Sequence, residues 1–152
     1  MVSPTGSAAE AAKALQKRYP TWFTSTRLEF PDGWAALVVR LADQIAAVLD
    51  ENHRVEFRVH QVKEKFGSLR FYWACPSMPP RGFQARAHAD GERWETRPEG
   101  DDAIHALVRR AEEESSRTCQ RCGGPGQRVN ASGMVATLCS SHGRDLERER
   151  GS

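Results

Sequence analysis

Four residues near the end of the chain have the types and the spacing of a zinc site: Cys119, Cys122, Cys139 and His142. Cys-x2-Cys comes first, sixteen residues follow, and Cys-x2-His completes the set. Zinc binds about four thiolate or imidazole ligands at tetrahedral corners, and each short pair supplies two corners from one tight turn. The alternative is a set of reduced cysteines without metal, but two successive paired spacings favour one structural zinc ion per chain.

The sixteen-residue spacer has the pattern of a short β-hairpin. Residues 127–130 and 134–138 are typical of strands, and Ala131-Ser-Gly133 between them is typical of a turn. Glycines at 123, 124 and 126 favour a tight first turn, because they allow positive φ behind the first cysteine pair. Together these features predict a zinc ribbon over residues 119–143.

No assembled catalytic set accompanies the zinc ligands, so no residue is assigned a catalytic role. If all four ligands come from the protein, no coordination position remains for water or substrate, and the metal stabilises structure. A Gly-rich phosphate loop is absent, and no carboxylate or nucleophile shares a regular spacing with the remaining histidines His53, His60, His88 and His105. An enzyme with a shallow site near Lys65 and Arg70 is therefore the third-ranked interpretation, after two kinds of binding protein.

A second stretch, residues 63–73, mixes basic and aromatic side chains. A surface that neutralises phosphates and stacks bases combines these residue types. The alternative is an ordinary hairpin, with its aromatic side chains in the core and its lysines on a solvated turn. The candidate partner-binding residues are Lys63, Lys65, Phe66 and Arg70 here, with Arg121 and Arg128 in the ribbon.

The elements that must position these residues follow from hydrophobic periodicity. Apolar residues at helical spacing predict helices over residues 8–18, 34–50 and 101–116, the second of them capped by Asp32. Alternating apolar residues predict a hairpin within residues 53–75, with a bulge at Gln61-Val62 and a connection at 63–68. Cys75 falls on the apolar side of its strand, so we expect a buried thiol there.

The rest of the chain completes an α+β organisation. We expect a flexible start and short helix over residues 1–20, and a body over 21–118 that includes an insertion-like segment at 76–98. A second hairpin is predicted around Asp90-Gly91, and a charged tail over 144–152. The predicted class is a small antiparallel hairpin or sheet packed with two main helices, plus the C-terminal zinc ribbon.

Composition limits the classes of function. The 152 residues are 39% hydrophobic, which suffices for one domain with an attached ribbon. No stretch approaches the roughly 18 apolar residues of a membrane span, and only one cysteine remains outside the zinc set, so a reducing cytoplasm is expected. Residues 53–98 carry nine basic and five acidic side chains, an excess compatible with an acidic or phosphate-bearing partner.

Two motifs together resemble a known group of proteins. Val62-Lys-Glu-Lys-Phe-Gly-Ser-Leu-Arg-Phe-Tyr72, followed by Cys119-x2-Cys-Gly123 and Thr137-Leu-Cys-x2-His142, is similar to small, largely uncharacterised bacterial and bacteriophage proteins. The resemblance spans roughly residues 30–142, and segment 76–98 departs from it. It implies an α/β body with a zinc ribbon and carriage by a phage or mobile element, and it implies no particular activity.

These observations lead to two hypotheses. The first is a small intracellular zinc-binding interaction protein with a protein partner and no membrane association. The alternative is a nucleic-acid-binding regulator that uses the basic hairpin and the ribbon. The sequence does not determine the oligomeric state.

Overall fold

The computed structural model describes residues 6–78, 83–88, 91–96 and 101–151, and the protein is of the α+β class, as the sequence predicts. The α-helices are α1 (Ala8–Arg18), α2 (Ala35–Val48), α3 (Glu51–Glu56), α4 (Asp101–Ser115) and α5 (Ser140–Gly151), and a 3-10 turn, η1 (Asp32–Trp34), precedes α2. The strands are β1 (Arg27–Glu29), β2 (Arg58–Lys65), β3 (Ser68–Ala74), β4 (Phe83–His88), β5 (Gly91–Thr96), β6 (Gln127–Ala131) and β7 (Met134–Leu138).

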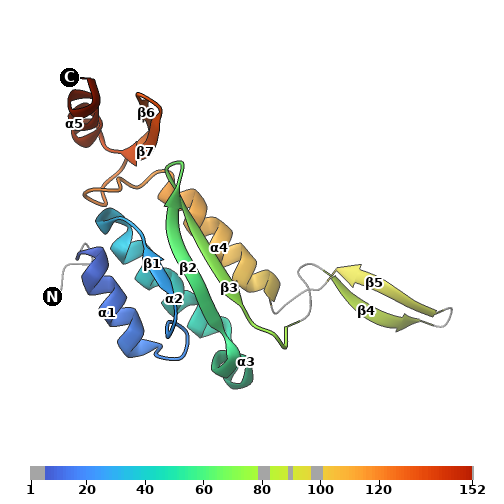
Figure 1. Ribbon diagram of the computed structural model, residues 1–152. Coiled ribbons are helices and arrows are strands. Elements are labelled where there is room, and N and C mark those ends of the chain that lie inside the picture. The colour runs from blue at the N-terminus through green and yellow to red at the C-terminus, as the bar shows by residue number, and fades with distance from the viewer. Residues whose placement is uncertain (1–5, 79–82, 89–90, 97–100, 152) are drawn as a thin grey trace.

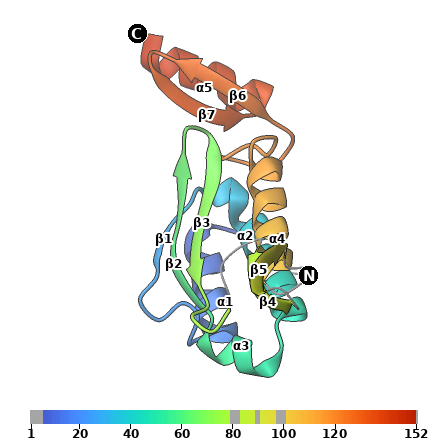
Figure 2. The same ribbon diagram turned by 90° about the vertical axis from the view of Figure 1, so that its right-hand side faces the viewer.

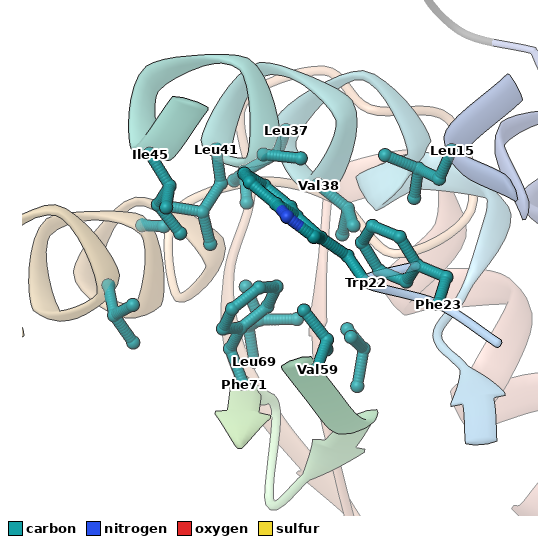
Figure 3. Packing of buried hydrophobic residues seen from close by; sticks show 14 of the residues in the cluster. Leu15, Trp22, Phe23, Leu37, Val38, Leu41, Ile45, Val59, Leu69 and Phe71 are labelled. Atoms are coloured by element: carbon teal, nitrogen blue, oxygen red, sulfur yellow. The ribbon is translucent and has the colours of Figure 1, made fainter. Parts of the chain in front are cut away.

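The body is a three-stranded sheet with helices on one side. Its order is β1-β2-β3, with β1 parallel and β3 antiparallel to β2. Helices α1, α2 and α4 lie on the same side of this sheet (Figure 2). The core lies between them, where buried side chains of α2 such as Leu41 face Leu69 and Phe71 of β3 (Figure 3). The opposite face of the sheet is left for polar residues.

The three predicted helices form close to their expected bounds, but one predicted cap acts on another helix. Helix α1 begins with a capping box, in which the Ser7 hydroxyl accepts a hydrogen bond from the Glu10 amide at 3.1 Å. The prediction that Asp32 caps the next helix is wrong: its carboxylate accepts a hydrogen bond from the Ala8 amide at 2.8 Å. Asp32 therefore helps to cap α1, and α2 begins at Ala35 without a side-chain cap.

The prediction of a strand starting near His53 is also wrong. Residues 51–56 form α3, because Asp50 accepts a hydrogen bond from the His53 amide at 2.8 Å and starts a helical turn. Val55, which the alternating pattern assigned to a strand, is 70% exposed. Phe57 after the turn is fully buried. The alternating apolar side chains are therefore buried only from Phe57 onward.

The β2–β3 hairpin is confirmed, with a shorter connection than expected. The pairing register shifts between Val59 and Gln61, one residue before the predicted bulge. The ladder continues to the pair Lys65–Ser68, so the predicted connection at 63–68 shrinks to Phe66-Gly67. Both turn residues have positive φ, 53° and 83°, as a two-residue type I′ turn requires. Lys63 consequently lies within a strand, not on the turn.

The remaining elements also agree with the predicted pattern. Strands β4 and β5 pair in register as a separate hairpin that projects from the body (Figure 1). The expected turn residue Asp90 and residues 1–5 of the expected flexible start lie outside the described residues. Helix α4 packs its Ile104, Val108 and Ala111 into the core. Among the described residues, no helix has the length and apolar character needed to cross a membrane.

Candidate metal centre

The two pairs of predicted zinc ligands converge on one point at the end of the molecule that carries β6, β7 and α5. The Sγ atoms of Cys119, Cys122 and Cys139 and a ring nitrogen of His142 all lie within 4.8 Å of one another. Cys122 Sγ and Cys139 Sγ are 3.9 Å apart, and His142 Nδ1 lies 3.5 Å from Cys119 Sγ and 3.1 Å from Cys139 Sγ. This Cys3His cluster could hold a metal ion.

The first cysteine pair lies on a tight turn that follows α4. The Cys119 amide donates to the Gly124 carbonyl at 2.7 Å, and the Gly123 amide donates to the Cys119 carbonyl at 2.9 Å. Gly123 has φ of 79°, which a side chain would strain, so one of the three expected glycines supplies the left-handed conformation. The turn places both thiols on the same side as the second pair.

The second pair lies where β7 passes into α5. Helix α5 begins at Ser140, earlier than the predicted charged segment at 144–150, so His142 belongs to its first turn. The His142 amide donates to Cys139 Sγ at 3.5 Å, and the Gly143 amide donates to the Cys139 carbonyl at 2.8 Å. The start of the helix therefore stabilises negative charge on the sulfur as well as fixing the imidazole.

Backbone amides also prepare the first cysteine for ligation. Burial opposes ionisation of the Cys119 thiol, but the amides of Cys139, Cys122 and Arg121 outweigh it and lower its pKa to about 6. The amide of Gly124 favours the Cys122 thiolate, yet burial and the neighbouring Cys119 and Cys139 sulfurs raise the Cys122 pKa overall. A thiolate is the form that binds metal, so Cys119 can bind a metal ion at neutral pH with little cost of deprotonation.

The metal cluster is joined to the body through the backbone of its first turn. The Gly33 amide donates to the Gln120 carbonyl at 2.8 Å, and the Trp34 indole Nε1 donates to the Thr118 carbonyl at 2.9 Å. Both donors are buried residues of η1. These bonds flank Cys119, so the first ligand is held directly against the body.

A second junction joins the ribbon to the β2–β3 turn. The buried Thr137 hydroxyl donates to the Gly67 carbonyl at 2.5 Å. Thr137 is itself held by Gln120, whose amide donates to the Thr137 carbonyl at 2.9 Å and whose side-chain oxygen accepts from the Thr137 amide at 2.6 Å. Sequence reasoning missed Gly33, Gln120 and Thr137, since no local pattern indicates which segments meet across such distances along the chain.

Cys75 is separate from the cluster and is buried, as expected. Burial, followed by the negative charge of Glu56, raises the pKa of its thiol to about 12. The side chain contacts the His53 carbonyl, with 3.6 Å between sulfur and oxygen. Cys75 therefore behaves as a small core residue without a reactive thiolate at neutral pH.

The candidate partner-binding residues of the hairpin occupy the helix-free face of the sheet and its tip. Lys63 and Arg70 are cross-strand partners, and Tyr72, 43% exposed, is the partner of Gln61. Lys63 Nζ lies 5.7 Å from the centre of the Tyr72 ring. Phe66 at the tip is 64% exposed, whereas Phe71 is buried in the core. Alternate residues of β3 therefore fit the two interpretations. Phe71 is a core residue, as in an ordinary hairpin, and Arg70 and Tyr72 lie on the face where a partner could bind.

The two ribbon arginines are not equivalent. Arg121 forms an ion pair with Glu149 of α5, with 3.3 Å between nitrogen and oxygen. Glu149 of α5 therefore neutralises the charge of Arg121. Of the two arginines, only Arg128 on β6 has an exposed side chain without an ion pair to the described residues. The structure does not bring Arg121 and Arg128 together with the hairpin residues into one contact cluster.

The fold and the cluster define an α+β protein with a Cys3His group suited to a metal ion. Comparisons of the chain with protein-family models, with curated proteins and with solved structures give no match.

Proposed function

We propose that the Cys3His cluster binds one zinc ion and that the chain is a zinc-stabilised interaction protein. Bond lengths of about 2.3 Å to sulfur and 2.0–2.1 Å to nitrogen place tetrahedral ligand atoms about 3.6–3.8 Å apart. Three separations within the cluster, 3.1, 3.5 and 3.9 Å, lie on either side of these values. Three thiolates and one imidazole also form a donor set that suits zinc better than the oxygen-preferring Mg²⁺ or Ca²⁺.

The completeness of the donor set carries the proposal. Four protein ligands fill a tetrahedral zinc, which leaves no position for a water nucleophile or a substrate. Cys119 is fully buried, and the turn that contains it is hydrogen bonded to η1. Bound zinc would therefore hold β6, β7 and α5 together and stabilise their contact with the body, and it would act as a structural element.

Metal analysis of the purified protein tests this proposal. Protein prepared without chelator should contain one zinc per chain, and Cys122→Ser should lose it. Cys75→Ser is the matched control, because it removes a buried thiol outside the cluster and should keep the stoichiometry. Wild-type protein that is folded, fully reduced and free of metal would show that the cluster has another role.

The interaction surface in this proposal is the helix-free face of the β1–β2–β3 sheet with the Phe66 tip. A protein partner is the first expectation from the sequence, and the exposed Phe66 and Tyr72 supply the aromatic side chains that protein interfaces favour. The same surface gives a specific reason to consider nucleic acid as a second candidate. Lys63 and Arg70 lie opposite each other in the ladder, and like charges at such positions are destabilising unless something else neutralises them.

Charge on this face supports the second candidate. By register the face carries Arg27, Arg58, Lys63, Lys65 and Arg70, and one acidic residue, Glu29. Glu29 is already bonded to Arg27 at 3.5 Å and to the Gln61 amide nitrogen at 3.3 Å. Within the described residues Arg58, Lys63, Lys65 and Arg70 form no ion pair, and Lys63 lies beside the exposed ring of Tyr72. Basic and aromatic side chains together bind single-stranded nucleic acid through phosphate contacts and base stacking.

A salt titration separates the two partner classes. Binding of a single-stranded oligonucleotide should weaken steeply with added salt. The double variant Lys63→Ala/Arg70→Ala should reduce the affinity and also the slope of log affinity against log salt concentration. Lys13→Ala/Lys17→Ala removes the same charge from exposed positions of α1 and should leave binding unchanged. Absence of oligonucleotide binding, with capture of a host protein that depends on Lys63 and Arg70, would favour the protein partner.

A further inference from the structure

A cavity of about 370 Å³ lies where α4 passes along the free edge of the sheet. Among the described residues β3 is the last strand of the sheet, and no further strand of this part of the chain pairs with its edge. The walls of the cavity are formed by Phe71, Tyr72 and Trp73 of β3 and by His105, Val108, Arg109 and Glu112 of α4. Volumes of this size suit a small organic ligand.

Contacts of α4 explain why the cavity opens at this point of the edge. The buried Ser115 hydroxyl accepts a hydrogen bond from the Leu69 amide at 2.8 Å and closes the edge there. One helical turn earlier, the Glu112 carboxyl group interacts with the amide of Phe71, two residues further along the strand. Beyond Glu112 the helix presents Arg109 and His105, and the space between strand and helix is the cavity.

Three kinds of recognition group meet in the cavity. Trp73 and His105 supply aromatic surface to the cavity, with 4.9 Å between their ring centres. Glu112 is a half-buried carboxyl group: burial raises its pKa, opposed by the charge of Arg70 and the amide of Phe71. Within the described part of the chain, neither Glu112 nor Arg109 forms an ion pair.

This chemistry matches one class of ligand. Aromatic rings offer stacking to a planar heterocycle, and a carboxylate accepts hydrogen bonds from an amino group. Arginine side chains bind phosphate. Arg109 lines the cavity, and Arg70 lies close enough for its charge to act on Glu112. A nucleotide combines these three features in one molecule.

We propose that the cavity binds a nucleobase that carries an exocyclic amino group, with the base against the Trp73 ring and its amino group donating to Glu112. The inference rests on the nucleic-acid candidate of the preceding section when the base belongs to a strand, and it stands alone when the ligand is a free nucleotide. Cytosine, adenine and guanine have the required amino group, whereas uracil presents a carbonyl oxygen to the same acceptor. The site therefore discriminates cytosine from uracil.

Matched ligands and matched variants test this inference on the zinc-loaded full-length protein. Short oligomers of deoxycytidylate and deoxyuridylate form one arm, and the mononucleotides CMP and UMP form the other. Wild-type protein should bind the cytosine ligand about tenfold more tightly, the effect of one hydrogen bond to a charged group. Glu112→Gln should remove most of this preference, because its amide both donates and accepts. Glu113→Gln, an exposed neighbour outside the cavity, should retain it.

Each outcome has a defined meaning. A preference in both arms that Glu112→Gln removes supports the site within a strand-binding surface. A preference for CMP over UMP that Glu112→Gln removes, together with no oligomer binding, supports a free-nucleotide site, and the nucleic-acid candidate then fails. Salt-dependent oligomer binding without base preference overturns the cavity inference and leaves the nucleic-acid candidate standing. A preference that persists in Glu112→Gln, or no binding in either arm, overturns the inference.

Discussion

Replacement of Gly33 by alanine is the sharpest test of the junction between the metal cluster and the body. Gly33 is buried in η1, and its amide is bonded to the Gln120 carbonyl at 2.8 Å. A Cβ atom at this position would lie 2.1 Å from the Cys119 carbonyl oxygen and 2.6 Å from the Gln120 carbonyl carbon. Both are backbone atoms, so a side chain cannot turn away to relieve the clash.

The expected cost follows from two effects. Forcing an extra carbon into a packed interior costs about 1–3 kcal/mol, and separating η1 from the turn also breaks the hydrogen bond of Gly33, worth about 1 kcal/mol. We therefore expect Gly33→Ala to lower the free energy of unfolding by about 2–4 kcal/mol. Because the displaced atoms adjoin Cys119, the variant should also bind zinc more weakly.

Urea unfolding followed by tryptophan fluorescence, together with zinc competition against a chelating dye, measures both effects. Gly143→Ala is the matched control, since its Cβ would meet nothing closer than Val129 Cγ1 at 3.9 Å, an ordinary contact. Alanine also favours a helix over glycine, so this control should keep or slightly raise stability. A Gly33→Ala protein with unchanged unfolding and unchanged zinc affinity would refute the junction as a packed contact.

Three further results are expected. Removing zinc with a chelator, or the Cys122→Ser change, should raise amide hydrogen exchange in residues 119–142 more than in α2, because metal binding is coupled to folding of the ribbon; equal exchange would contradict this. Phe71→Ala should lower the free energy of unfolding in urea by roughly 3–5 kcal/mol, whereas Lys65→Ala should change it by no more than about 0.5 kcal/mol. A larger loss for Lys65→Ala than for Phe71→Ala would show that the hairpin faces are misassigned. Cys75 should resist alkylation near neutral pH in the native state. Its thiol has a pKa of about 12 in the folded protein against an ordinary value of 9.0, so it ionises first in the unfolded chain. The free energy of unfolding should therefore fall as pH rises from 9.0 to about 12.

Local patterns predicted much of this fold because local physics determines it. The apolar stripe of α2, the ligand spacings and the hairpin turn at Ser132-Gly133 are each specified within a few neighbouring residues. The error at Val55 has the same origin, since alternation over three residues is weaker than the cap that Asp50 supplies to α3.

The features that the sequence did not reveal depend on contacts between distant segments. β1 has three residues and joins the sheet only by pairing in parallel with β2, about thirty residues later, so nothing in its own sequence marks it as a strand. The place of Glu112 beside Phe71 likewise depends on how α4 lies along the sheet edge. From sequence alone, Glu112 belonged to a run of three glutamates typical of a solvated helix end.

The junction at Trp34 has a consequence for the order of folding. The four metal ligands lie within 23 residues of one another, whereas the bond from the Trp34 indole to the Thr118 carbonyl joins residues 84 positions apart. Closing a short loop is entropically cheaper and faster than closing a long one. On a ribosome, η1 and α2 emerge well before the turn that they receive, so the Trp34 indole has no partner until residue 118 is made. A nascent chain thus holds a vacant docking position, which the Thr118 carbonyl fills once that segment has been made.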